Sequence, residues 1–355
     1  MADTPAPKKR KKNALSDGQG TLAGLLISPT MAVLLLVVGF PILMSVRESV
    51  YKTNDGIDPA TGMVAQGETF VGLQNYTDIF TNPQLVPGAW GSVDRFTNSF
   101  LNVTYFTIVC VVLETILGVA MALIMAKAFK GQGVVRAAIL VPWAIPTFVS
   151  AKMWALIFQS DGVMNKILGQ QILWLADGPQ SQLAIIIADV WKTAPFIGLL
   201  TLAGLQTIPA EVYEAAKVDG ASAWQQFTRI TMPMVKPALV VAVLFRTLDT
   251  MRMFDLPAGM IGFGKYYVET VSTLSYIENN NLRYGPAAAY AILLFLYIVL
   301  VAFVFVRLLG ADVVGDDDVK AMAEQRKRQK AAAKAAGTKA APAAKPTITS
   351  GSAAS

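Results

Sequence analysis

Eight ionisable residues lie inside or at the ends of long apolar stretches of this 355-residue chain: Glu114, Lys152, Asp189, Lys192, Arg246, Asp249, Arg252 and Asp255. A charge within a bilayer costs about 2.5–3.5 kcal/mol on insertion scales, so each should pair with another charge or face a polar ligand. The sequence has no histidine and one cysteine, which leaves few ligands for a His- or Cys-based metal site and excludes a Ser-His-Asp triad. We therefore expect no catalytic residue and no metal site.

The charges on two of these stretches follow helical spacing. Asp189, Lys192 and Phe196 stand at i, i+3 and i+7, and Asp249 and Arg252 repeat the i, i+3 step with an aromatic residue one turn earlier. A sugar suits such a mixture, because its C–H faces pack on rings and its hydroxyls bond charged groups. The alternative is a set of interhelical salt bridges, for example Lys192 with Asp249, and the two roles are compatible.

A more polar segment, residues 205–237, separates the two stretches. Within it AEVYEAAKV predicts a short helix that ends at Asp219-Gly220, because glycine is favoured just after a helix. Residues 222–231 predict a second short helix, followed by two prolines and the next apolar stretch. Two short helices joined at a glycine form an elbow.

Such an elbow can dock into a groove of another protein. Small side chains at Ala215 and Ala216 allow close approach, and Glu214 offers a charge-assisted hydrogen bond. The alternative is a re-entrant loop that rests on lipid headgroups.

The composition indicates what positions these residues. Hydrophobic residues make up 54% of the chain and charged residues 15%, where a soluble domain carries roughly a quarter. Six stretches reach the roughly 20 apolar residues needed to cross a bilayer: Leu22–Val46, Ser99–Met125, Val134–Phe158, Gln182–Leu205, Pro237–Ala258 and Pro286–Leu309. Backbone groups in lipid must bond internally, so we expect an all-α membrane protein with six transmembrane helices. Five prolines should kink these helices without ending them: Pro29, Pro41, Pro142, Pro146 and Pro195.

The distribution of basic residues predicts orientation. Twelve Lys and Arg residues before the C-terminal tail fall on one side of the six spans and seven on the other, so the richer side and both termini should be cytoplasmic. The chain then divides into a basic tail (1–20), a six-helix domain (21–310) and an Ala- and Lys-rich tail (311–355) with the composition of a disordered segment. Residues 70–80, in the long outer loop, predict a short amphipathic helix.

The elbow segment resembles the EAA loop of binding-protein-dependent ABC importer permeases. The matching positions are Glu214-Ala215-Ala216, Gly220, Ile230 and Met232-Pro233, where the family usually has Leu-Pro. Four further segments are similar to the carbohydrate branch of that family, related to the maltose-system permeases: FVGLQNYTDIF (70–80), LVPWAIPTFVSAKMWALIF (140–158), DVWKTAPFIGLLTLAGLQTIP (189–209) and FRTLDTMRMFDLP (245–257). The resemblance covers roughly residues 22–309.

The resemblance implies an ABC importer type I permease fold in a bacterial inner membrane. In that family the loop is a coupling helix seated in a cleft of a cytoplasmic ATPase subunit. This implies a coupling role for Glu214, Ala215, Ala216, Asp219, Gly220 and Ala221. It further implies four partner proteins: a second homologous permease, two ATPase subunits that bind ATP and Mg²⁺, and an extracytoplasmic solute-binding protein.

In the maltose permease the spans on both sides of this loop line the sugar pocket. The positions that match approximately here are Lys192, Phe196, Asp249 and Arg252, which the resemblance implies as solute-binding residues. Trp143 and Trp154 are expected to pack or to anchor at the interface, and Glu114 and Lys152 to be buried against a sister subunit.

Residues 259–265 fit the nucleotide-binding pattern G-x4-G-K, but Tyr266 replaces the Ser or Thr that would hold Mg²⁺. No strand is expected before them, and they fall on the outer side, so ATP hydrolysis must come from separate subunits and this chain is not an enzyme. The sequence predicts one permease subunit of an ATP-driven importer for a disaccharide or small oligosaccharide. Three alternatives remain: an ion-gradient-driven secondary transporter with Glu114 and Asp189 as proton carriers, an ABC permease for a non-sugar solute, and a membrane scaffold.

Overall fold

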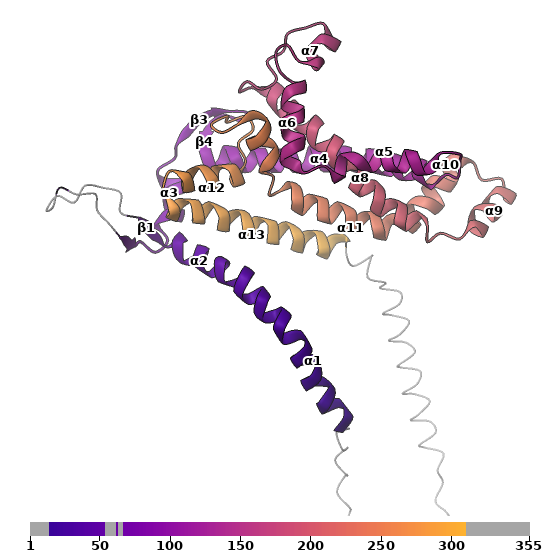
Figure 1. The fold of residues 1–355 in the computed structure, drawn as a ribbon, viewed down its shortest axis with the longest axis horizontal. Coiled ribbons are helices and arrows are strands. Elements are labelled where there is room, and N and C mark those ends of the chain that lie inside the picture. Colours follow the sequence, from indigo (N-terminus) through magenta and orange to yellow (C-terminus); the bar gives the residue numbers. More distant parts are fainter. Residues whose placement is uncertain (1–13, 54–61, 63–66, 310–355) are drawn as a thin grey trace, which may run out of the picture.

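The computed structural model describes residues 14–53, 62 and 67–309, and most of these residues are helical (Figure 1). The tail 311–355, for which we predicted disorder, and the first thirteen residues of the basic tail lie outside the described residues. The helices and π-helical turns (η) are α1 (Ala14–Leu34), η1 (Leu35–Gly39), α2 (Phe40–Ser49), α3 (Gln74–Thr81), α4 (Arg95–Ala126), α5 (Gln132–Ala144), α6 (Thr147–Ile157), α7 (Val163–Leu168), α8 (Pro179–Leu205), α9 (Ala210–Val218), α10 (Ala223–Gln226), η2 (Phe227–Thr231), α11 (Met232–Thr250), η3 (Pro257–Ile261), α12 (Val271–Asn280) and α13 (Tyr284–Leu309).

Five helices of the described part are long and apolar enough to cross a bilayer, and the bent pair α5 and α6 makes a sixth when the pair is counted as one span. The five are Leu22–Ser49, Arg95–Ala126, Pro179–Leu205, Ala223–Thr250 and Tyr284–Arg307. The prediction of an all-α membrane protein with six spans is therefore confirmed, with one span bent.

Helix α8 lies at the centre of the bundle and is the most buried of the spans. It packs on α4 at Gly118, where an added Cβ would lie 2.8 Å from the Ile197 Cβ. It packs on α11 at Gly204, where a Cβ would lie 2.8 Å from the Ala238 Cβ. Small residues let helix backbones approach closely, which is how helices associate in membranes without a hydrophobic driving force.

The third span is broken at its centre. Helices α5 and α6 are bent by 95° between Ala144 and Thr147, so our prediction that Pro146 would only kink the helix is wrong. Proline has no N–H to donate and disfavours the helical conformation in the residue before it, and Ile145 is accordingly extended. The other four prolines lie within helical stretches, as predicted.

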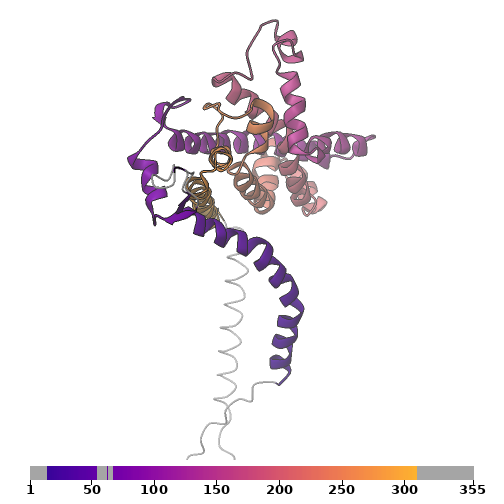
Figure 2. The ribbon, with the colours of Figure 1, turned by 60° about the vertical axis from the view of Figure 1, so that its left-hand side comes forward.

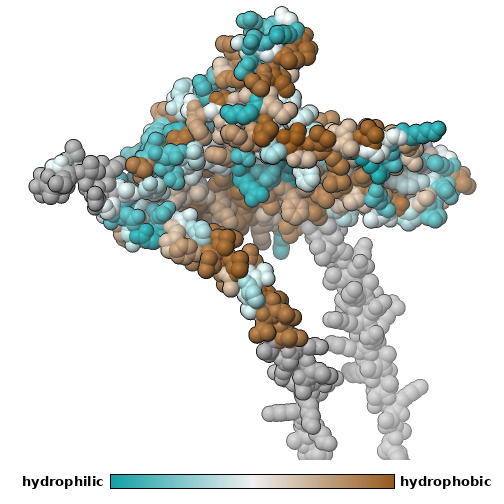
Figure 3. Space-filling model, viewed as in Figure 1, coloured by the Kyte–Doolittle hydropathy of each residue, from teal (hydrophilic) through white to brown (hydrophobic). Residues whose placement is uncertain are grey.

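The first span diverges from the other helices (Figures 1 and 2). Its most apolar segment contains no buried residue, and its exposed aliphatic side chains form a hydrophobic surface (Figure 3). Only its C-terminal part, α2, lies against α13. This span therefore adds little to the core of the chain.

The described part of the long outer loop contains two antiparallel strand pairs that the sequence did not predict. Strand β1 (Tyr51–Thr53) pairs antiparallel with β2 (Glu68–Phe70), and β3 (Leu85–Gly88) with β4 (Gly91–Asp94). The short helix predicted for residues 70–80 is confirmed as α3, held by the Asn75 amide, which donates to two backbone carbonyls of the α2–β1 segment at 2.8 and 2.9 Å. The loop therefore covers the outer end of α13.

Candidate functional site

Two adjoining cavities of about 440 and 220 Å³ open between α5, α8 and α11. All four residues predicted to bind solute line them: Lys192 lines the larger, Phe196 the smaller, and Asp249 and Arg252 line both. The structure thus brings the two helical stripes to one place. Their role in binding remains a prediction.

Lys192 does not pair with Asp249 in this structure. Its Nζ donates to the backbone carbonyls of Ile145 at 2.9 Å and of Trp143 at 3.4 Å. These carbonyls lie at the C-terminal end of α5, where the break before Pro146 leaves them without a helical partner, and a cation at a helix C-terminus satisfies them. The buried lysine therefore stabilises the bend. The pair that we gave as an example of an interhelical salt bridge, Lys192 with Asp249, does not form, although interhelical salt bridges do form around Arg246.

The guanidinium of Arg246 binds three carboxylates instead. Its Nε and Nη2 donate to the two oxygens of Glu114 at 2.6 and 3.1 Å, its Nη2 also donates to Asp189, and its Nη1 donates to Asp249 at 2.7 Å. The side chains of Arg246, Glu114 and Asp189 are at most 5% exposed. Glu114 also accepts a bond from the Thr193 hydroxyl at 2.6 Å. The expectation that Glu114 meets a sister subunit is therefore wrong, since its partners are in this chain.

Asp249 and Arg252 lie at the open side of this cluster, with side chains 56% and 69% exposed. They form a weak pair of 3.4 Å that leaves both groups able to bond a solute. The indole of Trp143 stacks on Phe196 with centroids 5.9 Å apart and lines both cavities. Our expectation for Trp143 did not include the cavity, and its place there depends on the bend that ends α5.

The larger cavity is lined by three cations and three carboxylates: Lys192, Arg246, Arg252, Asp189, Asp249 and Asp255. Two of the three cations are occupied, since Lys192 bonds carbonyls and Arg246 bonds carboxylates, whereas Arg252 is exposed beside Asp249. The remaining polar capacity suits hydroxyl groups, and the nearby rings suit the apolar faces of a sugar.

Cys110, Glu114 and Asp189 place a sulfur and two carboxylate oxygens within 4.8 Å of one another. Both carboxylates already accept bonds from Arg246. The guanidinium thus supplies a positive charge to both carboxylates.

The elbow lies at one end of the long axis of the molecule, and the outer loop lies at the other (Figure 1). Helix α9 ends in a Schellman motif: the Ala221 N–H donates to the Ala216 carbonyl at 2.9 Å and the Gly220 N–H to Lys217 at 3.1 Å. Gly220 has φ +77°, the left-handed region that glycine adopts readily. The sharp turn predicted at this glycine is confirmed.

Glu214 and Ala215 are exposed on the elbow, whereas Ala216 is buried and packs inward. The prediction that both alanines offer close approach to a partner therefore holds in geometry for Ala215 alone. Asp219 and Gly220 are exposed, and Ala221 is half-buried. The coupling role of these residues remains a prediction.

The second short helix of the elbow is not separate. Helices α10, η2 and α11 run without interruption from Ala223 to Thr250, and Pro233 and Pro237 lie within α11. A proline inside a helix leaves a carbonyl one turn earlier without its N–H partner, and in membrane helices neighbouring groups and local π-helical turns, such as η2 directly before Met232-Pro233, satisfy that carbonyl. The fifth span thus extends directly from the Ser222 cap.

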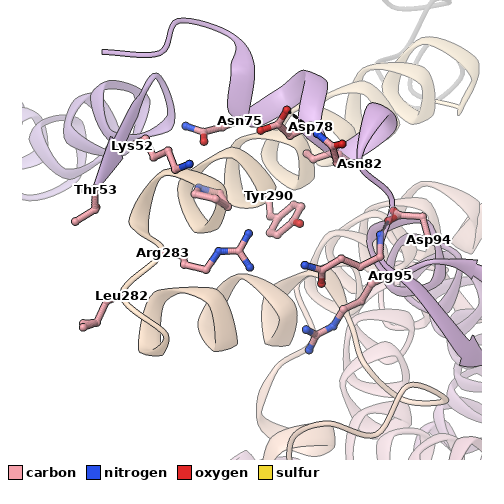
Figure 4. A pocket seen from close by; sticks show the side chains of 13 residues that line it. Lys52, Thr53, Asn75, Asp78, Asn82, Asp94, Arg95, Leu282, Arg283 and Tyr290 are labelled. Atoms are coloured by element: carbon pink, nitrogen blue, oxygen red, sulfur yellow. Dashed lines mark hydrogen bonds between the residues drawn. The ribbon is translucent and has the colours of Figure 1, made fainter. Parts of the chain in front are cut away.

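A second polar cavity of about 260 Å³ lies near the outer loop (Figure 4). Lys52, Arg95, Arg283 and Tyr290 line it, and beneath it Arg95 pairs with the buried Glu269 at 2.7 Å. This ion pair fastens the start of α4 to the segment before α12. This pair could not be predicted from local sequence patterns, because the two residues stand 174 positions apart.

The G-x4-G-K segment, residues 259–265, begins inside the π-helical turn η3. Gly259 lies in η3 against α6, where an added Cβ would be 2.9 Å from the Ala151 Cβ. The lack of a side chain at Gly259 therefore allows η3 to pack closely against α6.

A family model described as "Binding-protein-dependent transport system inner membrane component" matches residues 114–314, which include the cavities and the elbow. The chain belongs to this family. It is a transport permease and not an enzyme, as predicted. The assignment favours binding-protein-dependent transport over a secondary transporter or a scaffold.

Relatives in this family cover nearly the same length. The trehalose/maltose transport system permease protein MalF of Thermococcus litoralis is 37% identical over 295 residues, 81% of this chain and 94% of the relative. The trehalose transport system permease protein SugA of Mycobacterium tuberculosis is 35% identical over 300 residues, 83% and 91% of the two chains. The fold matches that of a bacterial alginate ABC transporter in complex with alginate pentasaccharide-bound periplasmic protein, with a TM-score of 0.69 at 18% identity over 85% of this chain and 99% of that one.

Proposed function

We propose that this chain is one permease subunit of an ATP-driven importer for an uncharged disaccharide or small oligosaccharide. The cavity beside Trp143 and Phe196 carries the proposal, because rings and hydroxyl-binding charges converge there from α5, α8 and α11. The relatives named for trehalose and maltose, which align over more than four fifths of the chain, support it.

The uncharged character of the solute follows from the pairing of the cavity's charges. An acidic sugar such as alginate needs a cation free to receive its carboxylate. Here Arg246 bonds three carboxylates and Lys192 bonds carbonyls. The remaining cation, Arg252, lies beside the exposed Asp249 carboxylate, which repels an acidic sugar. A second homologous permease supplies the other half of the translocation pathway in this proposal.

The elbow is the proposed contact with one of two cytoplasmic ATPase subunits, which bind ATP and Mg²⁺. Its exposed Glu214 and its rigid turn at Gly220 suit a docked lever, because a lever transmits motion only when its own shape is fixed. ATP binding drives transport if the two states of the permease differ in their contacts with the ATPases.

The remaining partners follow from the same geometry. A solute-binding protein delivers the sugar at the end opposite the elbow, where the outer loop lies, and the alginate transporter's complex with its periplasmic protein supports this. The family name supports placement in a bacterial inner membrane. The excess of basic residues on the elbow side supports cytoplasmic termini.

Uptake by the reconstituted complex tests the proposal. Proteoliposomes that hold this chain, the second permease and the ATPases, supplied with the binding protein, should take up labelled trehalose or maltose with ATP and leave alginate oligosaccharides outside. An uncoupler that collapses ion gradients should have no effect. Uptake that needs an ion gradient and no ATP, or that prefers the acidic sugar, contradicts the proposal.

A further inference from the structure

The cluster around Arg246 joins three spans through one side chain. Glu114 comes from α4, Asp189 from α8, and Arg246 and Asp249 from α11. Helices α8 and α11 are the spans that enter and leave the elbow. One guanidinium thus touches both spans that adjoin the elbow and a carboxylate at the cavity.

Two of the three carboxylates fix the guanidinium in place. Glu114 receives it through two parallel bonds, a geometry that restrains both position and plane, and is itself held by Thr193. Asp189 receives the other Nη2 bond and is buried with them. Separating Arg246 from these buried carboxylates would leave uncompensated charges in the protein interior, which is strongly destabilising. The guanidinium should therefore stay in this position.

The third carboxylate is different because it is the exposed one. Asp249 lines both cavities, and its Oδ2 accepts from Arg246 Nη1 while its Oδ1 faces Arg252. Asp249 is thus restrained from behind by a group that is itself fixed. Without that cation, Asp249 would face two carboxylates of like charge and would move away from them.

We propose that Arg246 is a positioning residue for the solute site: anchored by Glu114 and Asp189, it holds Asp249 where that carboxylate can accept a solute hydroxyl. The inference rests on the proposed function for the cavity, and adds a residue that does not itself need to touch the solute. It also ties the position of Asp249 to both spans that adjoin the elbow.

A double-mutant cycle on transport tests the proposal. Arg246→Lys keeps the charge but removes the forked geometry, Asp249→Asn removes the carboxylate, and the assembled complex carries each single variant or both. The probes are labelled trehalose and maltose. If Arg246 acts through Asp249, each single variant lowers uptake about tenfold and the double variant falls no further, whereas independent sites would give about a hundredfold loss.

Lys152→Gln is the matched control, because it removes a cation that lies outside the Arg246 cluster. The Lys152 Nζ lies over the Phe148 ring, on the neighbouring helix α6. In the double variant Lys152→Gln/Asp249→Asn, the fold-losses of uptake caused by the two single substitutions should multiply. The native Cys110 reports packing, since it is the only cysteine of the chain and is fully buried beside Glu114 and Asp189. It should resist maleimide in Arg246→Lys as in the unmodified chain, and labelling would assign Arg246 a packing role and overturn the proposal.

Thermal unfolding of the same four proteins supplies a readout that needs no sugar. If Arg246 and Asp249 are in contact, the drop in unfolding temperature of the double variant should differ from the sum of the drops in the two single variants. Additive unfolding temperatures, or a hundredfold loss of uptake in the double variant, overturn the positioning role. If no tested sugar is transported while the unfolding temperatures remain non-additive, the proposed function fails and the Arg246–Asp249 contact stands.

Discussion

Replacing Gly220 with alanine should weaken the grip of the ATPase on the elbow. Gly220 has φ +77°, and a non-glycine residue there costs roughly 1–2 kcal/mol. Nothing lies within 4 Å of the added Cβ, so the whole penalty falls on the backbone turn and none on packing. If the ATPase binds the elbow only in this shape, its affinity should fall about five- to thirtyfold.

The assay is titration of the purified permease complex, stripped of its ATPases, with the ATPase subunit. Gly131→Ala is the matched control: its φ is +88°, its Cβ also meets nothing within 4 Å, and it lies in the turn before α5, outside the elbow. Gly220→Asn should lose less than Gly220→Ala, because asparagine tolerates this conformation. Equal losses of affinity for the Gly220→Ala and Gly131→Ala variants, or no loss for Gly220→Ala, would show that the turn at Gly220 does not govern ATPase binding.

Three further substitutions test the bundle, each by thermal unfolding in detergent. Lys192→Met should lower stability by about 1–3 kcal/mol, since it leaves the carbonyls at the end of α5 unpaired, and an unchanged melting temperature would remove its role at the bend. Gly118→Val should cost about 1–3 kcal/mol by overpacking against Ile197, while Gly133→Val, where a Cβ meets nothing, should be milder. Arg95→Met should cost about 3–5 kcal/mol because Glu269, 2% exposed, loses its partner; a smaller loss than for Gly118→Val would contradict this.

Features set by local sequence were predictable. Hydropathy located the six spans, the amphipathic pattern located α3, and Gly220 located the turn of the elbow. The i, i+3 spacing placed Asp249 and Arg252 on one face, and both line the cavities. Each of these depends on residues within one or two helical turns.

Features set by distant residues were not predictable. The helix breaks before Pro146 because Lys192 is present to bond the carbonyls that the break exposes, and Lys192 stands 47 positions from Ile145. Lys192 and Arg246 are both cations able to pair with Asp249, and only the packing of α4 against α11 brings Glu114, 132 positions away, to Arg246. Charge and helical spacing alone cannot show whether Lys192 or Arg246 pairs with Asp249. The continuity of α10 with α11 was not predicted, because Pro233 and Pro237 indicated a boundary between the second short helix and the next span, whereas both lie within α11.

The most direct test of the account is site-specific photo-crosslinking from the elbow in the assembled transporter. A photoreactive residue at Glu214, which is exposed on α9, should form an adduct with the ATPase subunit whose yield changes when ATP binds. The same residue at Lys130, exposed in the turn between α4 and α5, serves as the control and should give little adduct. An elbow that forms no ATPase adduct, or no more than the control position, would contradict the claim that residues 205–237 couple this permease to an external ATPase.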